Sequence, residues 1–275
     1  MSIDRHVAEH YTHGNLAEAI LAALAASGKN AQVIAPADLA PVDEMHIGGR
    51  RATAEFAERL GFQPGLRLLD VGCGIGGPSR LFAAEHGCHV TGVDLTEEFC
   101  RVAALLTGRA GLAERIRYRQ ANALALPFDE AAFDGAYSIH AAMNIADKER
   151  LYAEIARVVK PGGVFGLYDV LQGPGGAPHY PVPWAEDPST SFLATSDELC
   201  DLIAAAGFEV VASRDRSEAG MAYFQETRGR FAEGAPPPLG PQIIMGPNYR
   251  EKIANLHANL EQSRIAPWEV VCRRV

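Results

Sequence analysis

A short glycine-rich segment, LLDVGCGIGGPSR, has residue types suited to holding a ligand against the backbone. Gly72, Gly74 and Gly77 fit the G-x-G-x-x-G pattern that binds nicotinamide dinucleotides when it lies between a strand and a helix. Asp94 follows roughly 20 residues later, where that pattern expects an acidic residue. The glycines predict a ligand-binding turn, but alone they do not identify the ligand.

Asp70 argues against a dinucleotide. It lies two residues before the first glycine, at the carboxyl end of an apolar run, so its carboxylate should face the same crevice. A pyrophosphate would be repelled by this charge. A sulfonium that carries an ammonium group would be attracted, because opposite charges a few ångströms apart gain roughly 4 kcal/mol at an effective dielectric constant of about 20. The loop is therefore predicted to bind a positively charged ligand.

The elements that must position this loop are those of a doubly wound sheet. From Leu66 to Gly166, short apolar or β-branched runs alternate with longer helical patterns, which is typical of parallel α/β proteins. A further helix and strand surround Gly207, and WEVVCRRV supplies a last strand. We expect an α/β fold with a seven-stranded, mostly parallel sheet and helices on both faces. The expected strands are 66–71, 88–94, 115–120, 133–139 and 163–170, and the expected helices are 77–86, 97–110 and 147–158.

Three segments fall outside this pattern. Residues 1–60 contain helical patterns and are predicted to form an N-terminal cap, while residues 61–275 form the core. Within the core, residues 171–195 and 217–262 read as lid segments rich in glycine, proline or helix formers. Because open α/β sheets bind ligands outside the carboxyl ends of their strands, we expect all three segments to roof that crevice.

Composition excludes several classes of protein. The formal net charge is −9, and the chain has no run of five basic residues, which disfavours nucleic acid as a partner. Five cysteines without a C-x-x-C pair read as reduced thiols of a cytoplasmic protein, and no metal site is expected. The start, MSIDRHVAEH, lacks the apolar core of a signal peptide, and LAEAILAALAA is too short to span a bilayer. The sequence leaves the oligomeric state open.

Four motifs together resemble a known family. In order and spacing, LLDVGCGIGG, VTGVDLT, QANALALPFDEAAFD and RVVKPGG are similar to those of the class I S-adenosylmethionine-dependent methyltransferases. The resemblance covers roughly residues 45–215 and is to the small-molecule type, such as the sarcosine/dimethylglycine and ubiquinone/menaquinone-biosynthesis enzymes. It implies a Rossmann-like methyltransferase fold, S-adenosyl-L-methionine as cofactor, S-adenosyl-L-homocysteine as product, and a small-molecule acceptor at N, O or C.

The resemblance also implies roles for the loop and the acids beside it. Gly72, Gly74 and Gly76 would let the backbone approach the methionine and ribose parts of the cofactor. Asp70 would lie near the ammonium group. Asp94 would accept from both ribose hydroxyls, a role that suits a carboxylate because it has two acceptor oxygens.

Further cofactor contacts are implied on both sides of the loop. Asn122 would accept from the adenine amino group, although many relatives have aspartate there, and Ala123 would offer its backbone N–H. Leu95 would line the site next to the ribose-binding acid. The segment DEMHIGGRRAT is similar to an I-H-x-G element, so His46 and Gly48 would lie over the methionine end.

His140 is the candidate general base. It lies in YSIHAAMNIADK, after the fourth expected strand, and an imidazole can accept a proton near neutral pH. We expect activity to rise with pH through the ordinary imidazole range. The alternative is that His140 only packs against the cofactor or substrate. Met143 and Asn144 are expected in the pocket wall, with Asn144 able to bind substrate, and Tyr11 of the cap could contact substrate or take part in catalysis.

Tyr180, Trp184 and Met245, in the two lid segments, suggest an apolar or cation-accepting substrate cavity. Aromatic faces can hold an alkylammonium by cation–π attraction, but such residues could equally be the core of the lid. Two other functions stay open from the sequence. One is a nicotinamide-dependent oxidoreductase, which Asp70 disfavours, and the other is a binding protein that keeps the cofactor without methyl transfer.

Overall fold

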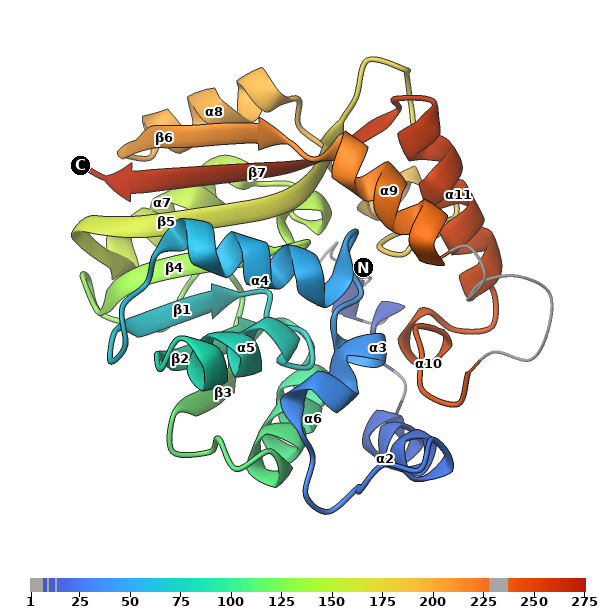
Figure 1. Cartoon of the computed structure of the whole chain (residues 1–275). Helices are drawn as coiled ribbons and strands as arrows, with labels where there is room; N and C mark the ends of the chain where they lie inside the picture. The colour runs from blue at the N-terminus through green and yellow to red at the C-terminus, as the bar shows by residue number, and fades with distance from the viewer. Residues whose placement is uncertain (1–6, 9, 13, 228–236) are drawn as a thin grey trace.

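The computed structural model describes residues 7, 8, 10–12, 14–227 and 237–275. Within them, seven strands form one sheet in the order β3-β2-β1-β4-β5-β7-β6 (Figure 1). The strands are β1 (Arg67–Val71), β2 (His89–Asp94), β3 (Ile116–Gln120), β4 (Phe133–Ile139), β5 (Val159–Gln172), β6 (Phe208–Asp215) and β7 (Ile265–Arg274). Only β7 runs antiparallel to its neighbours, β5 and β6, in this described sheet. The predicted fold class is confirmed.

Helices cover the sheet and its carboxyl edge. The α-helices are α2 (Leu16–Ala26), α3 (Ala40–Asp43), α4 (Gly49–Leu60), α5 (Gly77–Glu85), α6 (Glu97–Arg109), α7 (Lys148–Val158), α8 (Ser196–Ala205), α9 (Ser217–Thr227), α10 (Gln242–Met245) and α11 (Tyr249–Glu261). Three short 3₁₀ turns are η1 (Pro36–Leu39), η2 (Ala142–Asn144) and η3 (Pro188–Thr190). No helix in the described part of the chain is long and apolar enough to cross a bilayer.

Alternation along the strands divides the core into two layers. Leu68 and Leu69 are neighbours on β1 and therefore point to opposite faces of the sheet. Leu69 belongs to a buried cluster with residues of α7 and α8, whereas Leu68 belongs to a cluster with residues of α4 and α5. Both faces of the sheet are thus buried, which explains why the central strands read as nearly continuous apolar runs.

Helix α4 packs on the sheet, although it lies in the segment predicted as a cap. A Cβ on Gly166 of β5 would come within 2.4 Å of Leu60 and 2.7 Å of Phe56, so the helix lies directly on the strand at this glycine. The division at residue 60 stays a prediction, but the α4 part of the predicted cap contributes to the core. Strand β5 is also longer than predicted, because Val159 already pairs with Phe133 before the proline and glycines that follow.

The strand order reverses between β1 and β4, and this sets the place of the site. The two strands are parallel neighbours, with Asp70 opposite Tyr137. A reversal of this kind opens a crevice at the carboxyl ends of the two strands. Figure 1 shows α3 and α10 on the side toward which β1 points, with α9 and α11 above them. The glycine loop after β1 and the segment after β4 both open toward these helices.

Candidate active site

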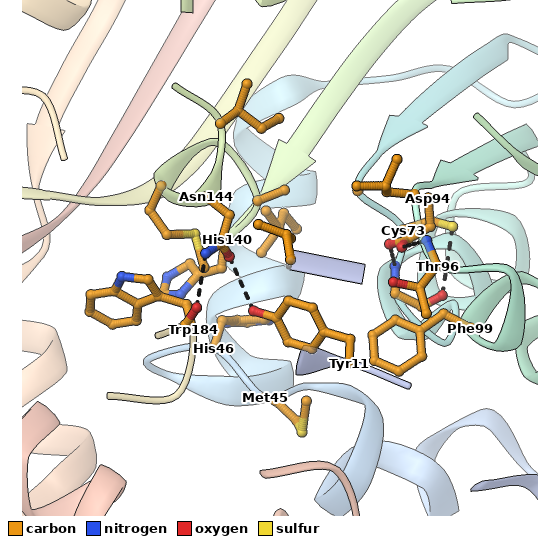
Figure 2. Close-up of a pocket in the computed structure, with 18 of the residues that line it drawn as sticks. Tyr11, Met45, His46, Cys73, Asp94, Thr96, Phe99, His140, Asn144 and Trp184 are labelled. Carbon is orange, nitrogen blue, oxygen red and sulfur yellow. Dashed lines mark hydrogen bonds between the residues drawn. The ribbon is translucent and has the colours of Figure 1, made fainter. Parts of the chain in front are cut away.

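A cavity of about 370 Å³ lies at these strand ends (Figure 2). All three segments predicted to roof the crevice contribute to its lining, through residues such as Tyr11, Trp184 and Met245. Most of the predicted site residues line it together: Tyr11, His46, Asp70, Gly72, Gly74, Asp94, Leu95, Asn122, Ala123, His140, Met143, Asn144, Trp184 and Met245. The structure thus brings together residues from both halves of the sequence.

Three predicted residues are not part of this lining. Gly76 turns its α-carbon toward the protein, where a Cβ would lie 2.2 Å from the Tyr118 hydroxyl. Gly48 lines a neighbouring cavity instead, and a Cβ there would lie 2.6 Å from Ala52. Tyr180 packs in an apolar cluster under the lid. The two glycines pack closely against the protein and Tyr180 packs within the lid, so their roles toward the cofactor and the substrate stay predictions.

Two glycines of the loop, Gly72 and Gly74, line the cavity but differ in the space around their α-carbons. Gly72 and Gly74 both have positive φ, but a Cβ on Gly72 would lie 2.3 Å from that of Ala141, whereas nothing lies within 4 Å of a Cβ on Gly74. The N–H of Gly74 donates to Oδ2 of Asp94 at 2.9 Å. Gly72 therefore lets the loop pass close to the segment after β4, and Gly74 leaves room for a ligand.

Asp94 is held by backbone donors at the end of β2. Its Oδ2 accepts from Gly74, and its Oδ1 accepts from the N–H of Thr96 at 2.9 Å. Burial raises the pKa of the Asp94 carboxyl, while the Thr96 and Gly74 donors oppose the increase. Both oxygens are thus fixed in direction at the cavity wall.

Asp70 is almost fully buried, with 1% of its surface exposed, at the end of β1. It accepts from the Ser79 hydroxyl at 2.6 Å and from the Tyr137 hydroxyl at 3.2 Å. Burial raises its pKa to about 7, and the negative charges of Asp94 and Glu44 add to the increase. The cavity wall here is therefore an acidic region in which ionised carboxylates repel one another.

An acidic, buried wall fits a cationic ligand and disfavours a phosphate. A sulfonium or ammonium near Asp70 would relieve the repulsion that raises its pKa, whereas a pyrophosphate would increase it. Arg80 does not offset this charge, because its guanidinium pairs with Asp43 at 2.6 Å behind the loop. The donor set therefore has the chemistry that an S-adenosylmethionine-type cofactor requires.

His140 occupies the opposite wall in a strained conformation. Its φ is +48°, uncommon for a residue with a side chain, and its N–H donates to the Tyr168 carbonyl at 2.8 Å. The ring lies 5.5 Å from that of His46 and 5.1 Å from that of Tyr168, centroid to centroid. Its Nε2 is buried without a hydrogen-bond partner in the described part of the chain. Burial, and then the charge of His46, hold the pKa of His140 well below its usual value.

Asn144 joins three segments of the chain (Figure 2). Its Oδ1 accepts from the Tyr11 hydroxyl at 3.1 Å, and its Nδ2 donates to the carbonyls of Trp184 and Thr190, each at 2.8 Å. The amide donors that were predicted to be available for substrate are thus already used within the protein. Through these two hydrogen bonds, Asn144 holds the lid against the turn after β4.

Asn122 is likewise used locally, because its Oδ1 accepts from the N–H of Leu124 at 2.9 Å. Sequence reasoning also missed lining residues. Phe99, in the first turn of α6, is 5% exposed and lies 5.5 Å from the Tyr11 ring, centroid to centroid. Its position five residues after Asp94 could have indicated it, since the first turns of a helix that follows a strand face the crevice. Other missed lining residues are Asp43, Met45, Cys73 and Ile75.

A second cavity of about 340 Å³ adjoins the first between α4, α9 and α11. Both cavities are lined by a common set of residues, which forms the wall between them: Met45, His46, Ile47, Met245 and Leu256. His46 therefore borders both spaces.

Comparison with known proteins agrees with this geometry. Residues 69–167 match the family model described as a methyltransferase domain. Sterol 24-C-methyltransferase ERG6B of Gibberella zeae is 39% identical over 116 residues, which is 42% of this chain and 30% of that protein. O-methyltransferase resE of Aspergillus sclerotiorum is 33% identical over 178 residues, 63% of this chain and 66% of that protein. The chain spans less than half the length of the first relatives it matches.

Solved structures support the fold. Geranyl diphosphate C-methyltransferase from Streptomyces coelicolor A3(2) aligns with a TM-score of 0.69 at 18% identity, covering 100% of this chain and 99% of that chain. The [4+2]-cyclase SpnF aligns with a TM-score of 0.64 at 24% identity, covering 93% of each chain. The domain match and the named relatives show that residues 69–167 carry a methyltransferase domain, and the four sequence motifs resemble those of the class I S-adenosylmethionine-dependent methyltransferases.

Proposed function

We propose that the protein transfers a methyl group from S-adenosylmethionine to a nucleophile on a small molecule. The observation that carries the proposal is the arrangement of one cavity. Acidic groups at the ends of β1 and β2 form one side, and a buried imidazole with a free nitrogen forms the other. The first side suits a cationic donor, and the second suits an acceptor that must lose a proton.

Asp70, Gly74 and Asp94 are the proposed cofactor-binding residues. Asp94 has its oxygens oriented by two backbone donors and would accept from ribose hydroxyls. Asp70 would pair with the ammonium group, and the open α-carbon of Gly74 leaves space beside it. When bound, the cofactor supplies an electrophilic methyl group on a positively charged sulfur. The chain's own part is to align the two reactants and exclude water.

His140 is the proposed general base. Its low pKa keeps the ring neutral at physiological pH, and the unpaired Nε2 can take a proton from an acceptor hydroxyl or ammonium. The backbone hydrogen bond to Tyr168 and the packing of the ring against His46 fix its direction. Because burial makes His140 a weak base, it would take the acceptor's proton while the acceptor bonds to the methyl group. The acceptor's proton becomes more acidic as that bond forms.

The acceptor is proposed to be largely apolar. The cavity is lined in part by Met143, Trp184, Ile244 and Met245, which are all buried. Several relatives are named for sterols, which are largely apolar, and this supports the same class here. The acidic wall and the net charge of −9 disfavour nucleic acid. The cytoplasmic location stays a prediction, which the free cysteines support.

A methylation assay tests the proposal. The purified protein would be incubated with methyl-labelled S-adenosylmethionine and a panel of apolar hydroxyl, amine and alkene acceptors, and labelled products would be separated by chromatography. We expect transfer to at least one acceptor, with release of S-adenosylhomocysteine, and loss of transfer in the Asp94→Ala variant. Tight cofactor binding without transfer to any nucleophile class would contradict the proposed reaction.

A further inference from the structure

The second cavity, of about 340 Å³, adjoins the proposed active site through a common wall. Ile47 and Leu256 belong to this wall and line both cavities. Away from the wall, the second cavity is lined by side chains of α9 and α11, among them Phe224 and Ile253. These two residues pack in the same apolar cluster as Ile47 and Leu256. An apolar group that crossed the wall would therefore remain in apolar surroundings.

The first cavity is small for two molecules. A pocket for one drug-sized ligand measures about 300–1,000 Å³, and the first cavity, at about 370 Å³, lies near the lower end of that range. Its lining includes Asp70, Gly74 and Asp94, so the proposed cofactor takes a large share of the space. A largely apolar acceptor therefore needs more room than the rest of this cavity supplies.

The wall between the cavities has two side chains that can move without a change of fold. Met45 and Met245 both belong to it, and methionine is unbranched and flexible. The backbone at Met245 is fixed, because its carbonyl accepts from Nζ of Lys252 at 3.1 Å. Ile47 is fixed as well, since its carbonyl accepts from the Tyr168 hydroxyl at 2.8 Å. The methionine side chains are thus the part of the wall that can open.

The arginines of the second cavity already have carboxylate partners. Nη1 of Arg51 donates to both carboxylate oxygens of Glu226, at 3.0 and 3.2 Å. Arg50 pairs with Glu85, and its guanidinium also lies 3.8 Å from the Glu44 carboxylate. A phosphate or carboxylate on a ligand would have to displace these acids and would be repelled by them. The second cavity therefore suits an uncharged apolar group.

We infer that the second cavity is a subsite for the uncharged apolar tail of the acceptor, which enters it past the side chains of Met45 and Met245. The inference rests on the proposed function, in which the reacting end of the acceptor lies beside His140 in the first cavity. It deepens that function, because it makes the acceptor an elongated molecule that occupies both cavities. Affinity should then depend on the length of the tail.

Binding of straight-chain primary alcohols tests this dependence. The series from hexanol to dodecanol would be titrated calorimetrically into the protein saturated with S-adenosylhomocysteine. We expect affinity to increase across the whole series by about fourfold per methylene, the value for complete burial of a CH₂ group. Affinity that did not change from octanol to dodecanol would overturn the inference.

Ile253→Trp fills the second cavity and leaves the first unchanged, because Ile253 lines only the second of the two. We expect this variant to bind hexanol as the wild type does but dodecanol at least about tenfold more weakly, since two or more methylenes stay outside. Ala254→Trp, at an exposed position of the same helix, is the matched control and should bind the whole series like the wild type.

Two results of this comparison would contradict the subsite. One is equal affinity of the Ile253→Trp and Ala254→Trp proteins for dodecanol. The other is an equal loss of affinity for hexanol and dodecanol in Ile253→Trp, which would indicate a separate site for small apolar ligands rather than room for a tail.

A crystal structure with a bromine-labelled probe decides the case in which Ile253→Trp does not fold. The wild-type protein would be crystallised with S-adenosylhomocysteine and ω-bromododecanol, and anomalous scattering would locate the bromine. We expect the bromine beside Phe224 and Ile253, the hydroxyl end in the first cavity, and the Met245 side chain displaced. Bromine in the first cavity, on the protein surface or at no fixed place would overturn the inference. Neither readout needs methyl transfer, so failure of the subsite is distinguishable from failure of the proposed reaction.

Discussion

The Tyr11 hydroxyl donates to Oδ1 of Asn144 at 3.1 Å, although the two residues are 133 positions apart. This hydrogen bond connects the N-terminal segment to the turn after β4, and the same asparagine holds the lid through Trp184 and Thr190. The cavity is therefore bounded by a chain of contacts that meet at one side chain. Removing that side chain should release both the cap and the lid.

Asn144→Ala should destabilise the lid more than Tyr11→Phe does. The alanine variant loses three hydrogen bonds and leaves two buried carbonyls unpaired, which should cost about 2–3 kcal/mol, whereas the phenylalanine variant loses one bond and should cost about 1 kcal/mol. Hydrogen exchange of residues 180–195 would measure the difference. Equal protection of this segment in the two variants would show that Asn144 does not fasten it.

Asp70→Asn should stabilise the ligand-free protein at pH 8. The pKa of Asp70 is about 7 in the folded chain, above its ordinary value of 3.8, so the folded state binds the proton more tightly than the unfolded state does. The free energy of unfolding is therefore least reduced by Asp70 below about pH 4, and it falls as the pH rises to about 7 and the buried carboxyl ionises. Asparagine cannot ionise, so the variant does not lose this stability at high pH. Thermal unfolding at pH 4 and pH 8 should show a higher Tm only at pH 8.

The same Asp70→Asn variant should bind S-adenosylmethionine more weakly, by about tenfold or more, because the ammonium group loses its ionic partner. Calorimetric titration at pH 8 measures this. Unchanged affinity, together with the higher Tm, would mean that the carboxylate faces no cation in the complex.

Gly74→Ala and Gly76→Ala should fail in different ways. A Cβ on Gly76 would lie 2.2 Å from the Tyr118 hydroxyl and φ is +85°, so backbone strain and overpacking should together cost about 2–4 kcal/mol. A Cβ on Gly74 meets nothing within 4 Å, so that variant should lose only about 1 kcal/mol of stability but should bind the cofactor poorly. Denaturant unfolding and cofactor titration of both variants test this reciprocal pattern.

His140→Ala should reduce turnover by about 10²–10⁴-fold with cofactor affinity nearly unchanged, which is the usual contribution of a general base. The expectation that wild-type activity rises through the ordinary imidazole range is corrected by the structure, since burial and His46 lower the pKa of His140. The wild-type profile should therefore be flat through the ordinary imidazole range, with the rise at lower pH. Unchanged turnover in the His140→Ala variant would show that His140 only lines the pocket and is not the general base.

The sequence predicted the sheet well because the strands that carry the site are buried on both faces. Their apolar runs are bounded by glycine, proline or a helix pattern, so β1, β2 and β4 begin and end within one residue of the prediction. Asp70 and Asp94 line the cavity for the same reason, because each lies at or next to the carboxyl end of a strand and strand ends meet at the crevice. Position along a strand was enough to locate them.

The hydrogen-bond partners could not be predicted in this way. Nothing in the local sequence indicates that the Asn144 amide donates to the carbonyls of Trp184 and Thr190, because those carbonyls belong to a lid without regular structure. Gly76 has the same type and spacing as Gly74, but it faces Tyr118 because the start of α5 turns it inward. The hydrogen bonds among Glu44, His46 and Thr53 could not be predicted either, because the start of α4 separates these residues and only the fold shows that their side chains meet.

Binding of S-adenosylmethionine by the wild-type and Asp94→Ala proteins tests the central claim most directly. Calorimetry should show a single site in the wild type, no binding of a nicotinamide dinucleotide, and affinity weakened by about 2–3 kcal/mol in the variant, the cost of losing a hydrogen-bonded carboxylate. Equal affinity of the two proteins for S-adenosylmethionine, or preferential binding of the dinucleotide, would contradict the assignment of the acidic cavity to a cationic methyl donor.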